Sequence, residues 1–178
     1  MKNRMKGFTL IELGVTLAVI GVIAGFAVPS LQNGIYAGHG NAARSALLAS
    51  LMTSSHKAAL HGARTTLCPS ADGTYCLSGF DWSHGWIGFI DQNGNREREP
   101  DESVISRHDS LQNARLISSS GRSRIVFQGN GGNAGSNVTF TLCDRRGAEK
   151  AQTLVLSNTG NLRKGAPDPA QLALACAF

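Results

Sequence analysis

The stretch GFTLIE, residues 7–12, opens a long apolar run that continues to Leu31. The part from Phe8 to Val28 would form a helix of about 31 Å at 1.5 Å per residue, which matches the hydrocarbon core of a bilayer. Glu12 is the one charged residue of the run. The pattern therefore predicts a membrane-spanning helix that carries a single carboxylate.

The residues before this run are basic, because Lys2, Arg4 and Lys6 occur there without an acidic residue. Basic flanks of a membrane helix stay on the cytoplasmic side. We therefore expect the chain to cross the inner membrane once, with the rest of the chain on the periplasmic side.

An ordinary secretory signal is the alternative interpretation of this N-terminus. Such a signal has a shorter apolar region before a small-residue cleavage site, and Gly25-Phe26-Ala27 could serve as that site. However, a carboxylate within a membrane costs about 2.5–3.5 kcal/mol, which an ordinary signal has no reason to include. Glu12 is therefore predicted to be functional.

The stretch Gly7-Phe8-Thr9-Leu10-Ile11-Glu12 resembles the type III signal of type IV prepilins and pseudopilins. The resemblance implies that a prepilin peptidase removes residues 1–7 as a leader and that the new N-terminal Phe8 is methylated. It also implies that residues 8–34 form the membrane and filament-core helix, and residues 35–178 a periplasmic pilin-like domain.

In this family a Glu stands at the fifth mature position and a Pro near the twenty-second, where the chain has Glu12 and Pro29. Cleavage after Gly7 would place the cationic amine of Phe8 in apolar surroundings. Glu12 of a neighbouring subunit can neutralise that amine, which offsets the desolvation of both groups. The resemblance thus implies that Glu12 acts in assembly with other major and minor pilins.

Four cysteines occur, without a C-x-x-C pair and without histidines at zinc-finger spacing: Cys68, Cys76, Cys143 and Cys176. An even number in a small domain favours two disulfides and an oxidising compartment over buried free thiols in the cytosol. Of the three possible pairings we expect Cys68–Cys76, whose intervening loop is short and rich in turn formers. Cys143–Cys176 would then tie the C-terminus to a strand.

The remainder of the chain predicts one helix and then strands. Residues 41–61 are amphipathic, with Leu47, Leu51 and Ala58 on one stripe, and the glycines at 34, 38 and 40 are expected to soften the junction before it. The fold class is therefore α+β, with a long N-terminal helix packed on antiparallel strands. The expected strands are 64–67, 85–90, 103–107, 114–117, 124–127, 137–142 and 153–156.

A second resemblance covers nearly the whole chain. Leu67-Cys68-Pro69-Ser70, Gly85-Trp86-Ile87 and Thr141-Leu142-Cys143-Asp144 are similar to the FimT/FimU/GspH minor pilins. The resemblance implies a subunit at the filament tip or priming complex of a type IV pilus, or else a GspH-like pseudopilin of type II secretion. Three large aromatic residues, Trp82, Trp86 and Phe89, are expected in the core.

The C-terminal half is basic. Residues 110–178 hold eight basic residues against three acidic ones, whereas residues 36–109 hold six against eight. Some FimT-like pilins are DNA receptors in natural transformation and carry a Gly-Arg-x-Arg motif, which corresponds here to Gly160-Asn161-Leu162-Arg163 and lacks one arginine. DNA uptake is therefore an alternative function, against ordinary solvated charge. Its candidate phosphate contacts are Arg145, Arg146, Arg163 and Lys164.

No catalytic or cofactor motif emerges. The clusters at residues 81–84 and 108–110 contain Ser, His and Asp, but strand neighbours point to opposite faces and cannot assemble a triad. Asp91, Asn93, Asn95 and Glu102 have the spacing of a calcium loop, yet Arg96 stands where its glycine belongs. We therefore expect a hairpin loop there, and a protein that is not an enzyme and binds no cofactor or metal.

Overall fold

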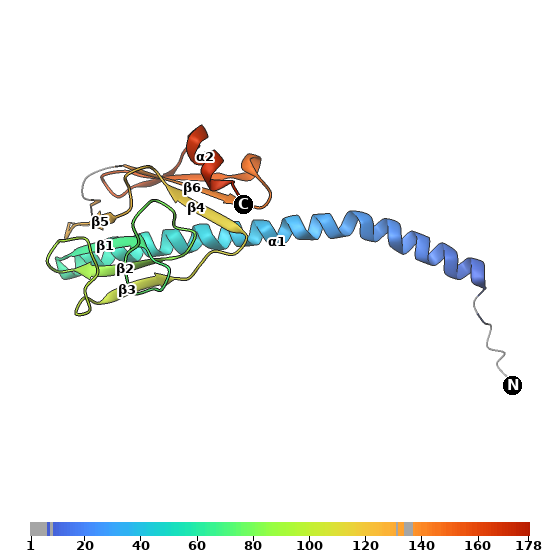
Figure 1. Cartoon of the computed structure of the whole chain (residues 1–178), viewed down its shortest axis with the longest axis horizontal. Coiled ribbons are helices and arrows are strands. Elements are labelled where there is room, and N and C mark those ends of the chain that lie inside the picture. Colours follow the sequence, from blue (N-terminus) through green and yellow to red (C-terminus); the bar gives the residue numbers. More distant parts are fainter. Residues whose placement is uncertain (1–6, 8, 131, 134–136) are drawn as a thin grey trace. The chain divides into compact units, whose positions relative to one another are not determined.

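The structure, a computed structural model, describes residues 7, 9–130, 132–133 and 137–178. The chain divides into two compact units, residues 1–35 and 36–178. One helix, α1 (Leu10–His61), supplies the described regular structure of the first unit and enters the second (Figure 1). The predicted long N-terminal helix is therefore confirmed.

Helix α1 does not end or change at the glycines near residue 34. Gly34, Gly38 and Gly40 are helical, as is Pro29, so α1 is continuous through the glycines that were expected to soften the junction. A glycine costs a helix only about 1 kcal/mol, which neighbouring turns tolerate.

In the first unit the large apolar side chains are exposed, for example Leu10 at 89% and Phe26 at 79%. By length and composition, α1 can cross a membrane.

The second unit contains two four-stranded antiparallel sheets. The sequence predicted strands in this region but not how they are grouped into sheets. The first sheet has the order β3-β2-β1-β5 and the second β4-β6-β7-β8. The first sheet is formed by β1 (Arg64–Pro69), β2 (Trp86–Asp91), β3 (Val104–His108) and β5 (Ile125–Phe127). The second is formed by β4 (Ala114–Ser118), β6 (Val138–Asp144), β7 (Gln152–Leu156) and β8 (Leu162–Lys164).

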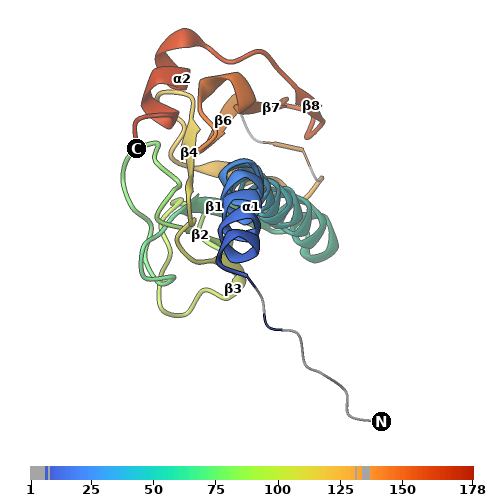
Figure 2. The same ribbon diagram turned by 90° about the vertical axis from the view of Figure 1, so that its right-hand side faces the viewer.

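Both sheets contribute to one core around the C-terminal part of α1. Figure 2 shows β6, β7 and β8 above this part of the helix and β2 and β3 to its lower left. The helix stripe of Leu47, Leu51 and Ala58 is buried in that core. The aromatic residues predicted to be core, Trp82, Trp86 and Phe89, are all 0% exposed.

Three elements were not predicted from the sequence: β8, the 3-10 turn η1 (Ala148–Lys150) and helix α2 (Pro169–Ala175). Strand β8 has three residues, two of them basic, so it lacks an apolar pattern of its own. Helix α2 had a signal that was missed: Asp168 caps it by accepting from the backbone N–H groups of Ala170 and Gln171, and proline follows directly.

Candidate assembly segment and basic surface

The N-terminal segment begins with Gly7, which is exposed, whereas Phe8 lies outside the described residues. Helix α1 starts at Leu10, three residues after Gly7 and the predicted cleavage position. Glu12 is exposed in the first turn of the helix. An exposed carboxylate among exposed apolar side chains is available to a group on another molecule.

Thr9 and Glu12 form reciprocal hydrogen bonds at the start of α1. The backbone N–H of Glu12 donates to Thr9 Oγ1 at 3.3 Å, and the backbone N–H of Thr9 donates to Glu12 Oε2 at 3.5 Å. This arrangement is a capping box, which satisfies N–H groups that have no partner within the helix. Glu12 therefore stabilises the helix start in addition to any role between subunits.

The four cysteines form two disulfides, Cys68–Cys76 and Cys143–Cys176, in the pairing expected from the sequence. The first closes the loop that follows β1. The second joins β6 to the residue after α2 and so holds the C-terminal segment against the second sheet. Ala175 and Cys143 are buried together with Ile117, which makes this attachment part of a small apolar cluster.

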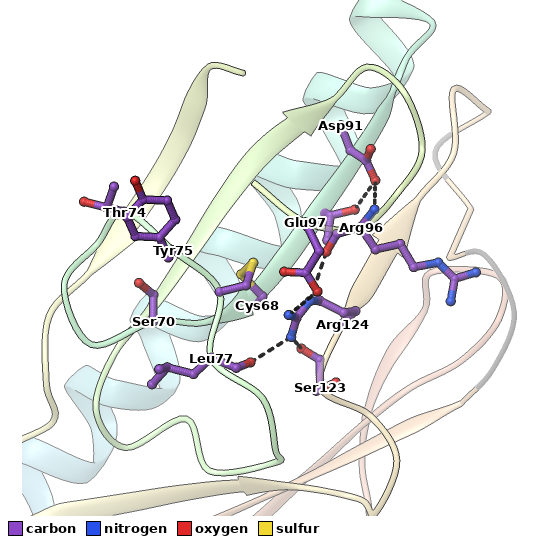
Figure 3. Close-up of a disulfide and its surroundings, with 12 residues drawn as sticks. Cys68, Ser70, Thr74, Tyr75, Leu77, Asp91, Arg96, Glu97, Ser123 and Arg124 are labelled. Atoms are coloured by element: carbon purple, nitrogen blue, oxygen red, sulfur yellow. Dashed lines mark hydrogen bonds and ion pairs between the residues drawn. A yellow bond between two sulfur atoms is a disulfide. The ribbon is translucent and has the colours of Figure 1, made fainter. Parts of the chain in front are cut away.

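Arg124 holds the first disulfide loop against the loop between β2 and β3 (Figure 3). Its guanidinium donates to the backbone oxygen of Leu77 at 2.8 Å and to that of Arg96 at 3.0 Å. It also forms an ion pair with Glu97 at 2.7 Å, and its side chain is only 12% exposed. Arg124 thus fixes two loops that are far from it in the sequence.

The β2–β3 loop uses its carboxylates to hold its own backbone. Asp91 accepts from the N–H groups of Gly94 and Arg96, and Glu102 accepts from those of Gln92 and Glu99. Arg96 has a positive φ of 68°, in place of the glycine of a calcium loop. Within the described residues, no group of three or more His, Cys, Asp or Glu is arranged to hold a metal ion.

Arg146 is committed to an ion pair with Asp144. Its Nε and Nη2 donate to the Asp144 carboxylate at 2.9 and 2.8 Å, and its backbone N–H donates at 3.0 Å. Burial raises the pKa of the Asp144 carboxyl, but these hydrogen bonds and the positive charge of Arg146 outweigh it, so the pKa lies below 3.8. Arg146 is therefore not a free phosphate ligand.

The other three candidate basic residues do not share one surface. Arg163 pairs with Val155 and Lys164 with Leu154 across β7 and β8, and adjacent strand residues point to opposite faces. Lys164 lies on the face of Leu154, which belongs to the core around α1. Arg145, by contrast, lies 5.5 Å over the ring of Phe178. The structure thus separates the four candidates.

Lys164 lines a polar cleft between α1 and the second sheet. The cleft has a volume of about 400 Å³ and brings Lys164 together with Arg44 from α1. Asn41 and Gln152, which also line it, are joined by a hydrogen bond of 3.3 Å. No acidic side chain lines this cleft among the described residues, so its polar lining favours an anion.

The family model described as Type II transport protein GspH matches residues 43–160, which is 118 of the 178 residues. The chain belongs to the GspH family. A model described as the prokaryotic N-terminal methylation motif matches residues 2–28 of this GspH-family chain. The two matches and the fold identify a minor pilin or pseudopilin, of the type IV pilus or type II secretion class. Pilin and pseudopilin families consist of structural, non-enzymatic subunits.

Two solved structures share the fold of the GspH-family chain. The type IV minor pilin FimU of Pseudomonas aeruginosa is 17% identical, with a TM-score of 0.55 over 71% of this chain and 92% of that one. The minor pseudopilin EpsH from the type 2 secretion system of Vibrio cholerae is 10% identical, with a TM-score of 0.51 over 72% and 98%. At these identities the likeness concerns the fold alone.

Curated relatives match the GspH-family chain over a short stretch. The type IV major fimbrial protein FimA of Dichelobacter nodosus is 54% identical over 33 residues, which is 18% of this chain and 21% of that protein. The chain therefore matches about one fifth of the length of these relatives.

Sequence reasoning on this GspH-family chain missed Arg44, Arg124 and the cap formed by Thr9. Thr9 had a readable signal, because Thr-x-x-Glu before an apolar run is the pattern of a capping box. Arg44 had none, because Lys164, which lines the same cleft, lies 120 positions later in the sequence.

Proposed function

We propose that this chain is a minor subunit of a type IV pilus that assembles at the filament tip or priming complex. A prepilin peptidase removes residues 1–7, and Phe8 becomes the methylated N-terminus. Residues 8–34 anchor the subunit in the inner membrane, with residues 35–178 in the periplasm, until the helix enters the filament. The observation that carries this proposal is the GFTLIE stretch within the matched methylation motif.

The role of the N-terminal segment follows from its chemistry. Its apolar side chains are exposed, so they need either lipid or the helices of other pilins as surroundings. When the helix moves from lipid into a filament, its apolar side chains exchange contacts with lipid for similar contacts with other helices. Glu12 gains a cationic partner at this step, the amine of Phe8 on the next subunit. Charge pairing at that step supports correct insertion.

Processing is tested by the intact mass of the protein from its native host. The expected product begins at methylated Phe8, and a strain without prepilin peptidase should accumulate the chain with residues 1–7 retained. A mature chain that begins at Val28 would instead indicate ordinary signal cleavage and would contradict the proposal.

The second candidate is a GspH-like pseudopilin of type II secretion. The fold similarity to EpsH supports this candidate, and the fold similarity to FimU supports the pilus subunit. Deletion of the gene distinguishes them. Fewer surface pili in electron micrographs, with normal levels of secreted enzymes, is the result expected for the pilus subunit. The reverse result would assign the chain to the secretion filament.

DNA uptake is not the function that the geometry favours. Arg146 is paired with Asp144, and Arg163 and Lys164 point to opposite faces of the second sheet. A phosphate backbone could therefore not contact all four candidate residues on one surface.

A further inference from the structure

Residues 165–178 cover the outer face of the second sheet, and we call them the C-terminal strap. Neighbouring residues of a strand face opposite sides of the sheet. Leu116 of β4 belongs to the core around α1, whereas the next residue, Ile117, packs with Ala175 of α2 on the other face. Figure 1 shows α2 beside β4 and β6. The strap therefore shields apolar side chains that the common core does not.

The C-terminal strap itself contributes little buried surface. Of residues 165–178 only Ala175 is buried, and Leu174 is 49% exposed. A cavity of about 470 Å³ lies between the strap and the sheet, lined by Gln171 and Leu174 on one side and by Ile117 on the other. Ordering the backbone of the strap costs conformational entropy, and the burial of one alanine does not offset it.

Polar groups beneath the strap also lack partners. Among the described residues, Nε2 of Gln171 and Oγ1 of Thr141 are buried without a hydrogen bond. Thr141 stands directly opposite Ile117 across β4 and β6, so its side chain shares the face that α2 covers. An unpaired polar group shielded from water destabilises the closed arrangement. Opening of the strap gives these groups access to water.

Few noncovalent contacts hold the strap in place. At its start the backbone N–H of Gly165 donates to the backbone oxygen of Thr153 at 3.0 Å. Near its end the guanidinium of Arg115 donates to the backbone oxygen of Ala177. Within the described part of the chain, no ion pair involves the strap. The disulfide to β6 is therefore its principal attachment.

The loop of the other disulfide, Cys68–Cys76, is held differently. The backbone N–H of Leu77 donates to the oxygen of Pro69 at 2.7 Å, which closes the loop without the sulfur atoms. The oxygen of Leu77 accepts from Arg124 at 2.8 Å, and the side chain of Arg124 is only 12% exposed. These hydrogen bonds do not depend on the S–S bond, so this loop can stay in place when its disulfide is broken.

We propose that the Cys143–Cys176 disulfide is a redox latch: its reduction releases residues 165–178, while both sheets and the common core stay folded. Local opening of this kind occurs where few buried apolar contacts hold a segment. The open latch exposes Ile117 and the thiol of Cys143. Oxidation of the two thiols thus completes the outer face of the subunit, whichever filament it enters.

The reductant of this step is a dithiol. Its thiolate attacks Sγ of Cys176, because Cys176 is partly exposed whereas Cys143 is 0% exposed. The S–S bond breaks, a mixed disulfide forms at Cys176, and Cys143 leaves as a thiolate that takes up a proton. The second thiol of the dithiol then displaces Cys176, so the dithiol is oxidised to a disulfide and both cysteines are reduced. The reverse reaction closes the latch.

Amide hydrogen exchange of the full chain in detergent, before and after treatment with dithiothreitol, tests the latch. The N–H groups of Leu172 and Cys176 donate within α2 to the oxygens of Asp168 and Leu172. We expect both to exchange about tenfold faster after reduction, whereas β6 and β7 should change by less than about twofold. Alkylation of a parallel sample verifies that the disulfides are reduced.

Matched variants separate this latch from the other disulfide. Cys176→Ser should show the fast exchange of α2 without any reductant, whereas Cys76→Ser should leave α2 as protected as in the wild type. If Cys176→Ser does not fold, the reduced wild type still decides. A limiting amount of glutathione, a monothiol, should leave its mixed disulfide on Cys176 in peptide maps, and an adduct on Cys143 would refute the proposed route.

Two results would overturn the latch. Equal exchange of Leu172 and Cys176 before and after reduction would show that the strap stays closed without the disulfide. Loss of protection throughout β6 and β7 would show that the disulfide holds the whole sheet and not a separable strap. Neither result bears on processing at Gly7, so the proposed function is tested independently.

Discussion

Gly40 of α1 faces Asp144 of β6 and leaves no room for a side chain between them. A Cβ atom on residue 40 would lie 2.5 Å from Oδ2 of Asp144, well inside van der Waals distance. The carboxylate has little freedom to move, because its side chain is 3% exposed and Arg146 holds it with three hydrogen bonds. The glycine is therefore required for α1 to approach the end of the second sheet.

Gly40→Ala should lower the stability of the domain by about 1–2 kcal/mol, because the displaced carboxylate loses hydrogen bonds in a buried place. Gly38→Ala is the matched control: nothing lies within 4 Å of its Cβ, and alanine improves helix propensity by about 1 kcal/mol. Thermal unfolding of the full chain in detergent, followed by near-UV circular dichroism of the buried tryptophans, measures both. A midpoint temperature of unfolding higher for Gly40→Ala than for the wild type would contradict the close packing of Gly40 against Asp144.

Acid should destabilise the domain partly through Asp144. The pKa of this carboxyl is below 3.8 in the folded protein, so its contribution is complete above about pH 4 and is lost as the pH falls through the folded value. Urea unfolding between pH 7 and pH 2.5 should show a steeper loss for the wild type than for Asp144→Asn. Asp101→Asn, an equal charge change at an exposed position, is the control and should follow the wild type.

The two disulfides should stabilise the fold unequally. Their sequence separations are 8 and 33 residues, for which chain entropy predicts about 2.5 and about 4 kcal/mol. Replacing Cys143 and Cys176 by serine should therefore lower the urea midpoint more than replacing Cys68 and Cys76. Peptide mapping without reduction checks the pairing, and a Cys68–Cys143 link would disagree with the sheet order described above.

Glu12→Ala should insert into the membrane as well as the wild type, or better, and should enter filaments poorly because the partner of the Phe8 amine is lost. Immunoblots of the membrane and sheared-filament fractions measure the two steps. Thr9→Ala removes one capping hydrogen bond but keeps the carboxylate, so it should enter filaments nearly normally. If both variants fail equally, helix capping rather than charge pairing explains the defect.

Much of the fold was predictable because its signals are local. The apolar run with Glu12 predicts a long N-terminal helix by its length and lack of charge, and α1 confirms it. Each of the seven expected strands also occurs, with bounds that differ by at most two residues. Strands are predictable because the alternation of apolar residues and the turn residues are signals within a few positions. The short loop between Cys68 and Cys76 likewise made their pairing the natural expectation.

The sequence by itself thus determined the long N-terminal helix, seven of the eight described strands and the membrane-sized apolar run, and where processing is expected. Only the tertiary structure decided how the strands divide into two sheets, that Arg146 is bound to Asp144, and that Lys164 lines a cleft with Arg44 and not with Arg163. The reason is physical: backbone preferences and hydrophobic period act over a few residues, whereas these contacts join side chains whose proximity depends on how α1 and both sheets bury one common core.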